Sequence, residues 1–327
     1  MSSSSPSRSM IKDVFRERFL ELLGSEEEYE RFVETILRPQ RKSFRVNSLK
    51  VEDEKALVEG IASKGLCVQR VPWCEGAYFV EYQEGTRTDL GNLFEHFLGQ
   101  IYVQEATSLL PPLVLDVPEN VGDDFRVLDV AAAPGSKTTQ LGALMKGKGI
   151  IVANELDYKR LGPLKLNLER SGLCNIVITH GDGTRIEGEE VYDRIMLDAP
   201  CSGSGVIRKS PGTLKVYNPK RLRQVQHLQL KLLRRAFALL KKGGILVYST
   251  CSLDPEENEL CIQKFLEEEK GVELLDAKIP NIVLSHKVRS FDGVDVLPEI
   301  SECTMRVWPQ DNDTNGFFVA KLRKVEE

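Results

Sequence analysis

From residue 126 onward the chain alternates short apolar runs with longer amphipathic stretches, and this alternation restricts the folds open to it. The amphipathic stretches predict helices at Asp157–Ser171, Pro219–Lys241 and Glu256–Glu269. Strands that alternate with helices form a mostly parallel sheet covered on both faces, so the sequence predicts an α/β fold. The apolar runs predict strands at Arg126–Val130, Gly149–Asn154, Asn175–Thr179, Arg194–Leu197, Gly244–Ser249, Val272–Leu275 and Gly316–Leu322.

A loop of small residues follows the first predicted strand. Sheets of this kind bind ligands beyond the carboxyl ends of their strands, where backbone N–H groups at the start of a helix reach the ligand. The loop lacks the first glycine of a phosphate-binding loop and the Gly-x-Gly-x-x-Gly pattern of a dinucleotide fold. An ordinary strand–turn–helix connection is the plain alternative. The candidate cofactor contacts here are Ala131, Ala132, Ala133, Pro134, Gly135, Ser136 and Lys137.

Acidic residues follow the next three predicted strands. Glu155 ends the second strand, where a carboxylate can accept both hydroxyls of a ribose. Asp182 follows the third strand and Asp198 the fourth, although either could simply cap a helix. Arg160, just beyond Glu155, completes the candidate cofactor contacts. A nucleoside without a pyrophosphate group suits this set, and S-adenosylmethionine is such a ligand.

Two cysteines follow the ends of the fourth and fifth predicted strands. If the strand order is 3-2-1-4-5, these strands are neighbours about 4.8 Å apart. Cys201 and Cys251 would then face one cleft, with Asp198 between them. A buried structural thiol is the common fate of a free cysteine, and a disulfide is a further alternative. A zinc site is not expected, because the spacing of zinc ligands is absent.

The amino-acid composition limits the cellular compartment and the binding partners that the chain can have. The 327 residues carry 44 Lys and Arg against 49 Asp and Glu, a formal charge of −5. The 7 cysteines include no Cys-x-x-Cys pair, and no signal peptide is recognisable, which favours a reducing, cytoplasmic location. No apolar run is long enough to cross a membrane.

Positive charge is nevertheless concentrated in one stretch. Residues 201–242 contain eleven Lys and Arg and no Asp or Glu. A solvated helix face normally mixes both signs, so this stretch favours binding to a phosphate backbone. Tyr217 and Asn218 could add contacts to bases. The candidate RNA contacts are Arg45, Lys50, Arg208, Lys209, Lys220, Arg221 and Arg223.

The sequence pattern of the N-terminal part predicts a separate small α+β domain over residues 1–98. The larger domain is expected to follow over residues 99–327. Its apolar spacing predicts helices at Met10–Leu23, after Ser25 and over residues 53–63, and a strand at Phe44–Lys50. A helix at Gln104–Val114, ending near Pro111 and Pro112, is expected to lead into the larger domain.

Taken together, these segments resemble the Sun/Fmu family of RNA (cytosine-5)-methyltransferases over nearly the whole chain from Arg38 onward. The two cysteine motifs, in this order after the small-residue loop, make the resemblance specific. Its pieces are Arg45-Val46-Asn47-Ser48-Leu49-Lys50, Tyr102-Val103-Gln104-Glu105-Ala106, Ala132-Ala133-Pro134-Gly135-Ser136-Lys137-Thr138, Asp198-Ala199-Pro200-Cys201-Ser202-Gly203, Ser249-Thr250-Cys251-Ser252 and Gly316-Phe317-Phe318.

The resemblance implies a Rossmann-like class I methyltransferase domain, with a seven-stranded sheet of order 3-2-1-4-5-7-6, behind a small RNA-recognition-like domain. It implies S-adenosylmethionine as the methyl donor, Cys251 as the nucleophile and Cys201 as a helper in product release. Asp198 is expected to act on the base. The substrate would be a cytosine in tRNA or rRNA, and the enzyme a monomer.

Two other functions stay open at this stage. One is methyl transfer to an exocyclic amine, which commonly uses Asn/Asp-Pro-Pro-aromatic after the fourth strand and needs no cysteine. The other is a catalytically silent RNA-binding or assembly factor.

Overall fold

The computed structural model describes residues 7–83 and 89–325. The chain forms two compact units, each of which combines distant parts of the sequence. The first unit comprises Met1–Gln40, Ala199–Arg234 and Val247–Glu327, and the second comprises Arg41–Asp198 and Arg235–Leu246. The predicted domain boundary between residues 98 and 99 stays a prediction.

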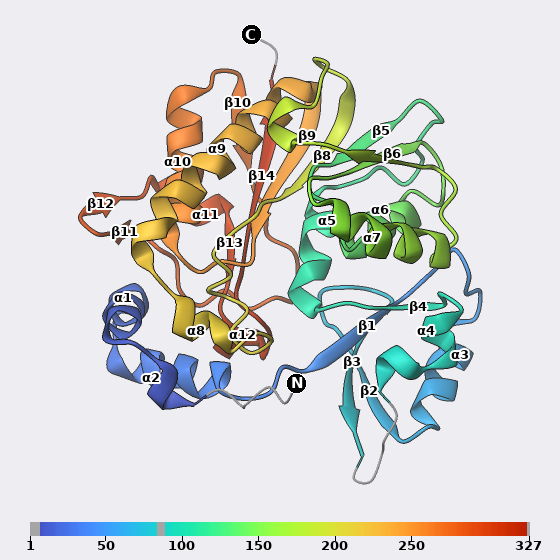
Figure 1. The fold of residues 1–327 in the computed structure, drawn as a ribbon, viewed down its shortest axis with the longest axis horizontal. Coiled ribbons are helices and arrows are strands. Elements are labelled where there is room, and N and C mark those ends of the chain that lie inside the picture. Colours follow the sequence, from blue (N-terminus) through green and yellow to red (C-terminus); the bar gives the residue numbers. More distant parts are fainter. Residues whose placement is uncertain (1–6, 84–88, 326–327) are drawn as a thin grey trace. The chain divides into compact units, whose positions relative to one another are not determined.

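The large sheet has the strand order β10-β14-β9-β8-β5-β6-β7, with β13 paired to β14 (Figure 1). Numbered along the alternating region, the seven main strands follow the order 3-2-1-4-5-7-6, so the predicted topology is confirmed. The β5, β6, β7 and β8 pairings are parallel, whereas β14 is antiparallel to β10 and β13. The strands are β5 (Arg126–Asp129), β6 (Ile150–Glu155), β7 (Ile176–His180), β8 (Tyr192–Asp198), β9 (Leu240–Thr250), β10 (Val272–Leu275), β13 (Met305–Val307) and β14 (Phe317–Lys324).

Helices separate these strands as the sequence predicts. Within the second unit, α6 and α7 pack against each other and against β6 (Figure 1). Apolar side chains at helical spacing, such as Leu164 and Leu168 on α7, are buried under them with Ala132 and Ala133. The main helices are α6 (Ser136–Leu144), α7 (Tyr158–Arg170), α9 (Leu222–Leu239) and α10 (Glu259–Glu268).

A smaller antiparallel sheet, of order β2-β3-β1-β4, lies in the second unit. Its core contains Phe44, Ile61, Leu66 and Tyr78. The predicted strand over residues 44–50 is too long, because the Asn47 side chain accepts the Leu49 N–H and turns the chain after Val46. The elements are β1 (Lys42–Val46), α3 (Glu54–Ala62), β2 (Leu66–Arg70), β3 (Ala77–Tyr82), η2 (Leu90–Asn92), α4 (Phe94–Phe97) and β4 (Ile101–Val103).

The two predicted N-terminal helices are α1 (Asp13–Leu23) and α2 (Glu26–Ile36), and both belong to the first unit. The Ser25 side chain caps α2, and Gly24 in the left-handed region ends α1. Phe15, Phe19 and Phe32 stack on one another, and Trp308 meets Phe32 edge to face. Aromatic packing therefore fixes these helices to the C-terminal part of the chain.

Two helix predictions need correction. Residues 104–114 are not one helix but η3 (Ala106–Leu109) and α5 (Leu110–Val114), with Pro111 and Pro112 in the first turn of α5. Proline is tolerated there because the first N–H groups of a helix have no partner within it. The helix predicted at Pro219–Lys241 begins as η5 (Pro219–Arg221) and ends at Leu239, where β9 starts.

Several short elements escaped sequence prediction. They carry too few residues for a periodic pattern, and β11 and β12 form only a two-residue ladder. Along the part of the chain that is described, no helix is both long and apolar enough to cross a membrane. The short elements are η1 (Arg8–Met10), η4 (Gly183–Arg185), α8 (Gly212–Val216), η6 (Pro255–Glu257), β11 (Ser290–Phe291), β12 (Val294–Asp295), α11 (Pro298–Cys303) and α12 (Pro309–Asn312).

Candidate active site

The small-residue loop between β5 and α6 presents backbone at the start of a helix. Gly135 caps α6 with a φ of 102°, a conformation that favours glycine, and a Cβ there would lie 3.1 Å from Leu164. No side chain of the described residues caps this end of α6. The first turn of a helix presents N–H groups that suit an anionic ligand group.

Glu155, at the end of β6, is buried and holds this loop. Its Oε2 accepts the Ala133 N–H at 3.1 Å, and its Oε1 accepts the Asp157 N–H at 2.9 Å. A carboxylate has about four acceptor sites, so two are left for the hydroxyls of a ribose. The predicted contact of Glu155 with a ribose stays a prediction.

Further side chains brace the same loops. The Arg160 guanidinium donates to Ala133 O, and it lies 3.5 Å from Glu155 Oε2. Asn154, which the sequence reasoning missed, donates from Nδ2 to Val130 O and Gly181 O at 3.0 Å each. Asn154 joins the loops that follow β5 and β7, and its only sequence signal is its place directly before Glu155.

Asp182 has the capping role that was weighed as an alternative. Its Oδ1 accepts both the N–H and the hydroxyl of Thr184, at 2.9 and 2.8 Å, and so caps η4. The side chain is still 42% exposed and lies 3.8 Å from Arg185. Capping does not prevent such a carboxylate from also meeting a ligand, so its predicted cofactor contact stays a prediction.

A polar cluster links β5, α6 and the end of β8. Lys137 Nζ lies 2.7 Å from Asp198 Oδ2, so these two predicted site residues are in contact. Asp129, which was not predicted as a site residue, is fully buried, and its Oδ2 accepts the Thr138 hydroxyl at 2.6 Å. Burial raises the pKa of Asp129 to about 7. A group poised near neutrality therefore lies beneath the loop.

The structure brings the two predicted cysteines together. Their sulfur atoms lie 2.9 Å apart, and both cysteines are partly buried. The residues around them are polar or small: Ser202 and Ser252 hydroxyls are 3.2 Å apart, and Gly205 N donates to Cys251 O. The buried structural thiol, the alternative weighed for each cysteine, does not describe this environment.

Glu257 ties the two cysteine loops to each other, and the sequence reasoning did not identify it. Its side chain is buried, and its Oε2 accepts the Ser202 N–H at 2.9 Å and Gln229 Nε2 at 3.0 Å. Its Oε1 accepts the Ser252 hydroxyl at 2.8 Å. Ser202 and Ser252 each directly follow one of the cysteines, so a single carboxyl group fixes both loops. Burial raises the pKa of Glu257 above its ordinary value.

Close backbone packing completes this arrangement. A Cβ on Gly205 would lie 2.4 Å from Gly316 O and 2.7 Å from Cys251 O, so only glycine fits. Gly316 opens the Gly-Phe-Phe segment of the sequence resemblance, and its N–H donates to Gly205 O at 2.8 Å.

Two predicted RNA contacts are wrong because their side chains are buried. Arg45 is 5% exposed and donates to Gln104 and Thr139, and burial lowers its pKa to about 10. Arg208 is 7% exposed and donates to the carbonyl groups of Pro39 and Thr314. Neither guanidinium group is presented to a phosphate on the surface.

The other predicted contacts differ in their surroundings. Tyr217, expected to stack on a base, is 5% exposed, and its hydroxyl donates to Asp254, so that expectation is also wrong. Asn218 caps η5. Lys50 is exposed but donates to Leu98 O and Arg170 O. The remaining predicted contacts are exposed, namely Lys209, Lys220, Arg221 and Arg223.

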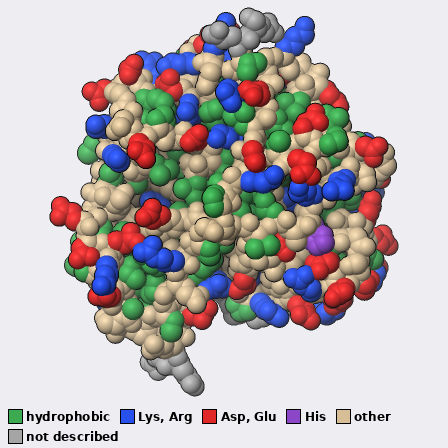
Figure 2. Space-filling view, turned by 180° about the vertical axis from the view of Figure 1, so that it is seen from behind, with side chains coloured by type: hydrophobic (Ala, Val, Ile, Leu, Met, Phe, Trp, Pro, Cys, Tyr) green, Lys and Arg blue, Asp and Glu red, His purple; other side chains and the backbone are tan. Residues whose placement is uncertain are grey.

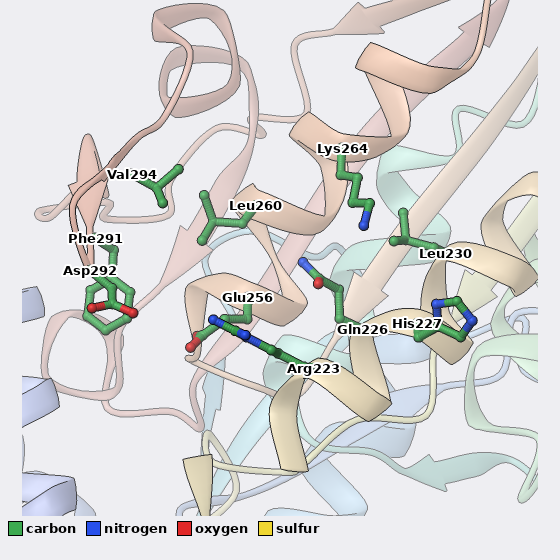
Figure 3. A pocket seen from close by; sticks show the side chains of 10 residues that line it. All are labelled: Arg223, Gln226, His227, Leu230, Glu256, Leu260, Lys264, Phe291, Asp292 and Val294. Carbon is green, nitrogen blue, oxygen red and sulfur yellow. The ribbon is translucent and has the colours of Figure 1, made fainter. Parts of the chain in front are cut away.

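Surface charge is mixed elsewhere. On the face shown in Figure 2, Lys and Arg side chains are interspersed with Asp and Glu. A pocket of about 410 Å³ between α9, α10 and the β11–β12 hairpin shows the same mixture, since Arg223 and Lys264 share it with Glu256 and Asp292 (Figure 3). No group of three or more His, Cys, Asp and Glu suited to a metal occurs among the residues described.

Three features together define a Rossmann-like methyltransferase domain. They are the order of the strands in the large sheet, the loop of small residues after β5, and the acidic residues at the ends of the strands. The family model "16S rRNA methyltransferase RsmB/F" matches residues 115–323, and the model "N-terminal domain of 16S rRNA methyltransferase RsmF" matches residues 11–106. The chain belongs to this RsmB/F methyltransferase family, and the predicted family relationship is confirmed.

Relatives in bacteria cover most of the chain. "Ribosomal RNA small subunit methyltransferase F" of Shewanella piezotolerans is 40% identical over 305 residues, which are 90% of this chain and 60% of the relative. The protein of the same name from Escherichia coli (strain SE11) is 40% identical over 96% of this chain and 63% of its own length. The chain thus spans about six tenths of the length of these curated relatives.

Solved structures agree in fold. A methyltransferase homolog protein from Pyrococcus horikoshii is 36% identical, with a TM-score of 0.81, over 98% of this chain and 100% of that one. The structure described as PH0851 is 32% identical, with a TM-score of 0.83, over 99% of this chain and 70% of that one.

Proposed function

We propose that the chain transfers a methyl group from S-adenosylmethionine to carbon 5 of a cytosine in RNA, through a covalent bond between Cys251 and carbon 6 of the base. The observation that carries the proposal is the 2.9 Å separation of the Cys201 and Cys251 sulfur atoms. The relatives are named for the RNA of the small ribosomal subunit, so this RNA is the first substrate to test, with tRNA as the alternative.

The residues of the second unit suit the methyl donor. Glu155 would accept the ribose hydroxyls, and the first turn of α6 would receive the donor's carboxylate. Ala131 to Lys137, Arg160, Asp182 and Asp198 complete the proposed contacts. When bound, S-adenosylmethionine supplies an electrophilic methyl group on its sulfonium.

Cys251 is proposed as the nucleophile because carbon 5 of cytosine is unreactive until a nucleophile adds at carbon 6. The addition forms the bond from sulfur to carbon 6 and moves the electrons of the ring double bond toward carbon 5 and N3. A proton shared between N3 and Asp198 would offset the charge that develops on the ring. A free thiol of pKa about 8.5 is only a few per cent thiolate at pH 7, so loss of its proton must accompany attack.

Product release requires a second group. Once carbon 5 carries the methyl group, its hydrogen must leave as a proton. The electrons of that bond then re-form the ring double bond, and Cys251 departs as a thiolate. Cys201 is proposed to assist this step by accepting the proton that leaves carbon 5.

Two cysteine variants test the proposal. Cys251→Ser should abolish methyl transfer from labelled S-adenosylmethionine, because a serine hydroxyl adds poorly to carbon 6. Cys201→Ala should still form the adduct but release it slowly, and the protein should remain on the RNA as a denaturant-resistant band. Cys174→Ser, at an exposed free cysteine, is the matched control and should behave like the native protein.

The outcomes separate the competing functions. Full methylation by Cys251→Ser would reject the covalent route and favour transfer to an exocyclic amine. RNA binding by the native protein with no methyl transfer to any RNA would favour a silent binding factor. Mapping the labelled position to 5-methylcytosine in small-subunit rRNA or in tRNA identifies the substrate.

A further inference from the structure

A groove of about 690 Å³ lies between the start of α1 and the loop that joins α8 to η5. Lys12 and Val14 line it from one side, and Val216, Lys220 and Arg221 line it from the other. Its floor is Tyr217, whose side chain is buried. Val216 is 75% exposed, so its side chain is open to contact.

The groove carries positive charge without a balancing acid. Three of its lining residues are cationic, and none of the lining residues within the described chain is a carboxylate. The pocket in Figure 3 differs, because Glu256 and Asp292 accompany its cations there. Lys220 and Arg221 also lie in the stretch of 201–242 that contains no acid. Charge complementarity therefore favours an anionic partner.

The floor of the groove is connected to the Cys251 loop. The Tyr217 hydroxyl donates to Asp254 Oδ1 at 2.5 Å, and Arg18 donates to both groups at 3.1 Å. Asp254 is three residues beyond Cys251, so their α-carbons lie within about 11 Å. The floor of the groove and the Cys251 loop are thus joined by a buried hydrogen bond.

We propose that this groove binds the phosphodiester backbone of single-stranded RNA a few nucleotides from the cytosine that reacts. The assignment rests on the proposed function, because it takes the RNA substrate from there. Lys12, Lys220 and Arg221 neutralise phosphates, and Val216 contacts the apolar face of a sugar or base.

The test uses the double variant Lys220→Gln/Arg221→Gln and a fluorescent single-stranded RNA oligonucleotide that contains cytosine. The control Lys148→Gln/Lys270→Gln removes the same charge from exposed positions outside the groove. Anisotropy titrations over a series of salt concentrations give the affinity and its salt dependence. Loss of two phosphate contacts should raise the Kd about tenfold at low salt and reduce the slope of log K against log salt by about 1.4.

Steady-state kinetics give a second measurement. The groove variant should raise the KM for RNA and leave kcat unchanged, because phosphate contacts outside the reacting nucleotide bind substrate and transition state alike. If the groove variant has the same Kd, the same salt dependence and the same KM as the control, the proposal is wrong. This holds whether or not methylation proceeds normally.

Other outcomes distinguish this proposal from the proposed function. If the native protein binds RNA through the groove but methylates nothing, the groove assignment stands and the catalytic proposal fails. If the variant binds RNA normally but loses affinity for polyglutamate, the groove serves an acidic protein, and the RNA assignment is wrong.

Discussion

At the scale of single residues, Glu257 joins the two cysteine loops, a role that the cysteine motifs alone do not reveal. It accepts hydrogen bonds from the residues that directly follow Cys201 and Cys251. Glu257→Ala removes the acceptor of the buried Ser252 hydroxyl and of the partly buried Ser202 N–H, at a cost of about 1–3 kcal/mol in the free energy of unfolding. The variant should also let the two sulfur atoms drift apart. The rate at which diamide joins Cys201 and Cys251 in a disulfide should therefore fall.

Matched substitutions separate positioning from general stability. Glu257→Gln keeps one acceptor oxygen and should restore most of the unfolding free energy and of the diamide rate. Glu267→Gln, at an exposed position of α10, should change neither quantity. A diamide rate that Glu257→Ala leaves unaltered would show that the sulfur separation does not depend on this carboxyl group.

At the scale of elements, the segment after β1 anchors the C-terminal end of α7. Asn47 Nδ2 donates to Ser171 O and Gly99 O at 2.9 and 2.8 Å, and Lys50 Nζ donates to Arg170 O at 2.7 Å. The Arg170 and Ser171 carbonyl groups lie at the end of α7, where a helix needs partners and where its dipole favours a cation. The polar side chains of Asn47 and Lys50 thus stabilise the helix that carries Arg160.

Substitutions in this segment test whether it anchors α7 or binds RNA. Asn47→Ala should lower the free energy of unfolding by about 2–4 kcal/mol, because it leaves two buried carbonyl groups unpaired. Lys50→Met should cost about 0.3–1 kcal/mol through the helix dipole, and its RNA affinity should keep the native salt dependence. Denaturant unfolding and anisotropy measure these effects. If Lys50→Met reduces the slope of log K against log salt, Lys50 is an RNA contact as the sequence predicts.

At the scale of the whole molecule, the sequence predicts the order of elements better than the surroundings of charged side chains. Apolar periodicity places Glu155, Asp198 and Cys251 near strand ends, because a buried strand needs a continuous apolar run. Buried Arg208 donates to the carbonyl groups of Pro39 and Thr314. No local sequence pattern connects Arg208 with these two residues, so its burial cannot be predicted from the sequence. The role of Glu257 cannot be predicted from the sequence for the same reason, because its partners become neighbours only after folding.

The pH dependence of unfolding tests the polar cluster at the core of the second unit. The pKa of Asp129 is raised to about 7 when folded, against about 3.9 in an unfolded chain, so the native state holds its proton more tightly. This residue therefore makes the folded state lose stability as pH rises from about 4 to 7, at about 1.4 kcal/mol per unit, with no further loss above. Asp129→Asn removes the titrating group but keeps an oxygen for the Thr138 hydroxyl. The difference in free energy of unfolding between Asp129→Asn and the native protein should grow in favour of the variant over this range and then level off. Denaturant unfolding at a series of pH values measures it, and a difference independent of pH would mean that Asp129 stays ionised in the fold.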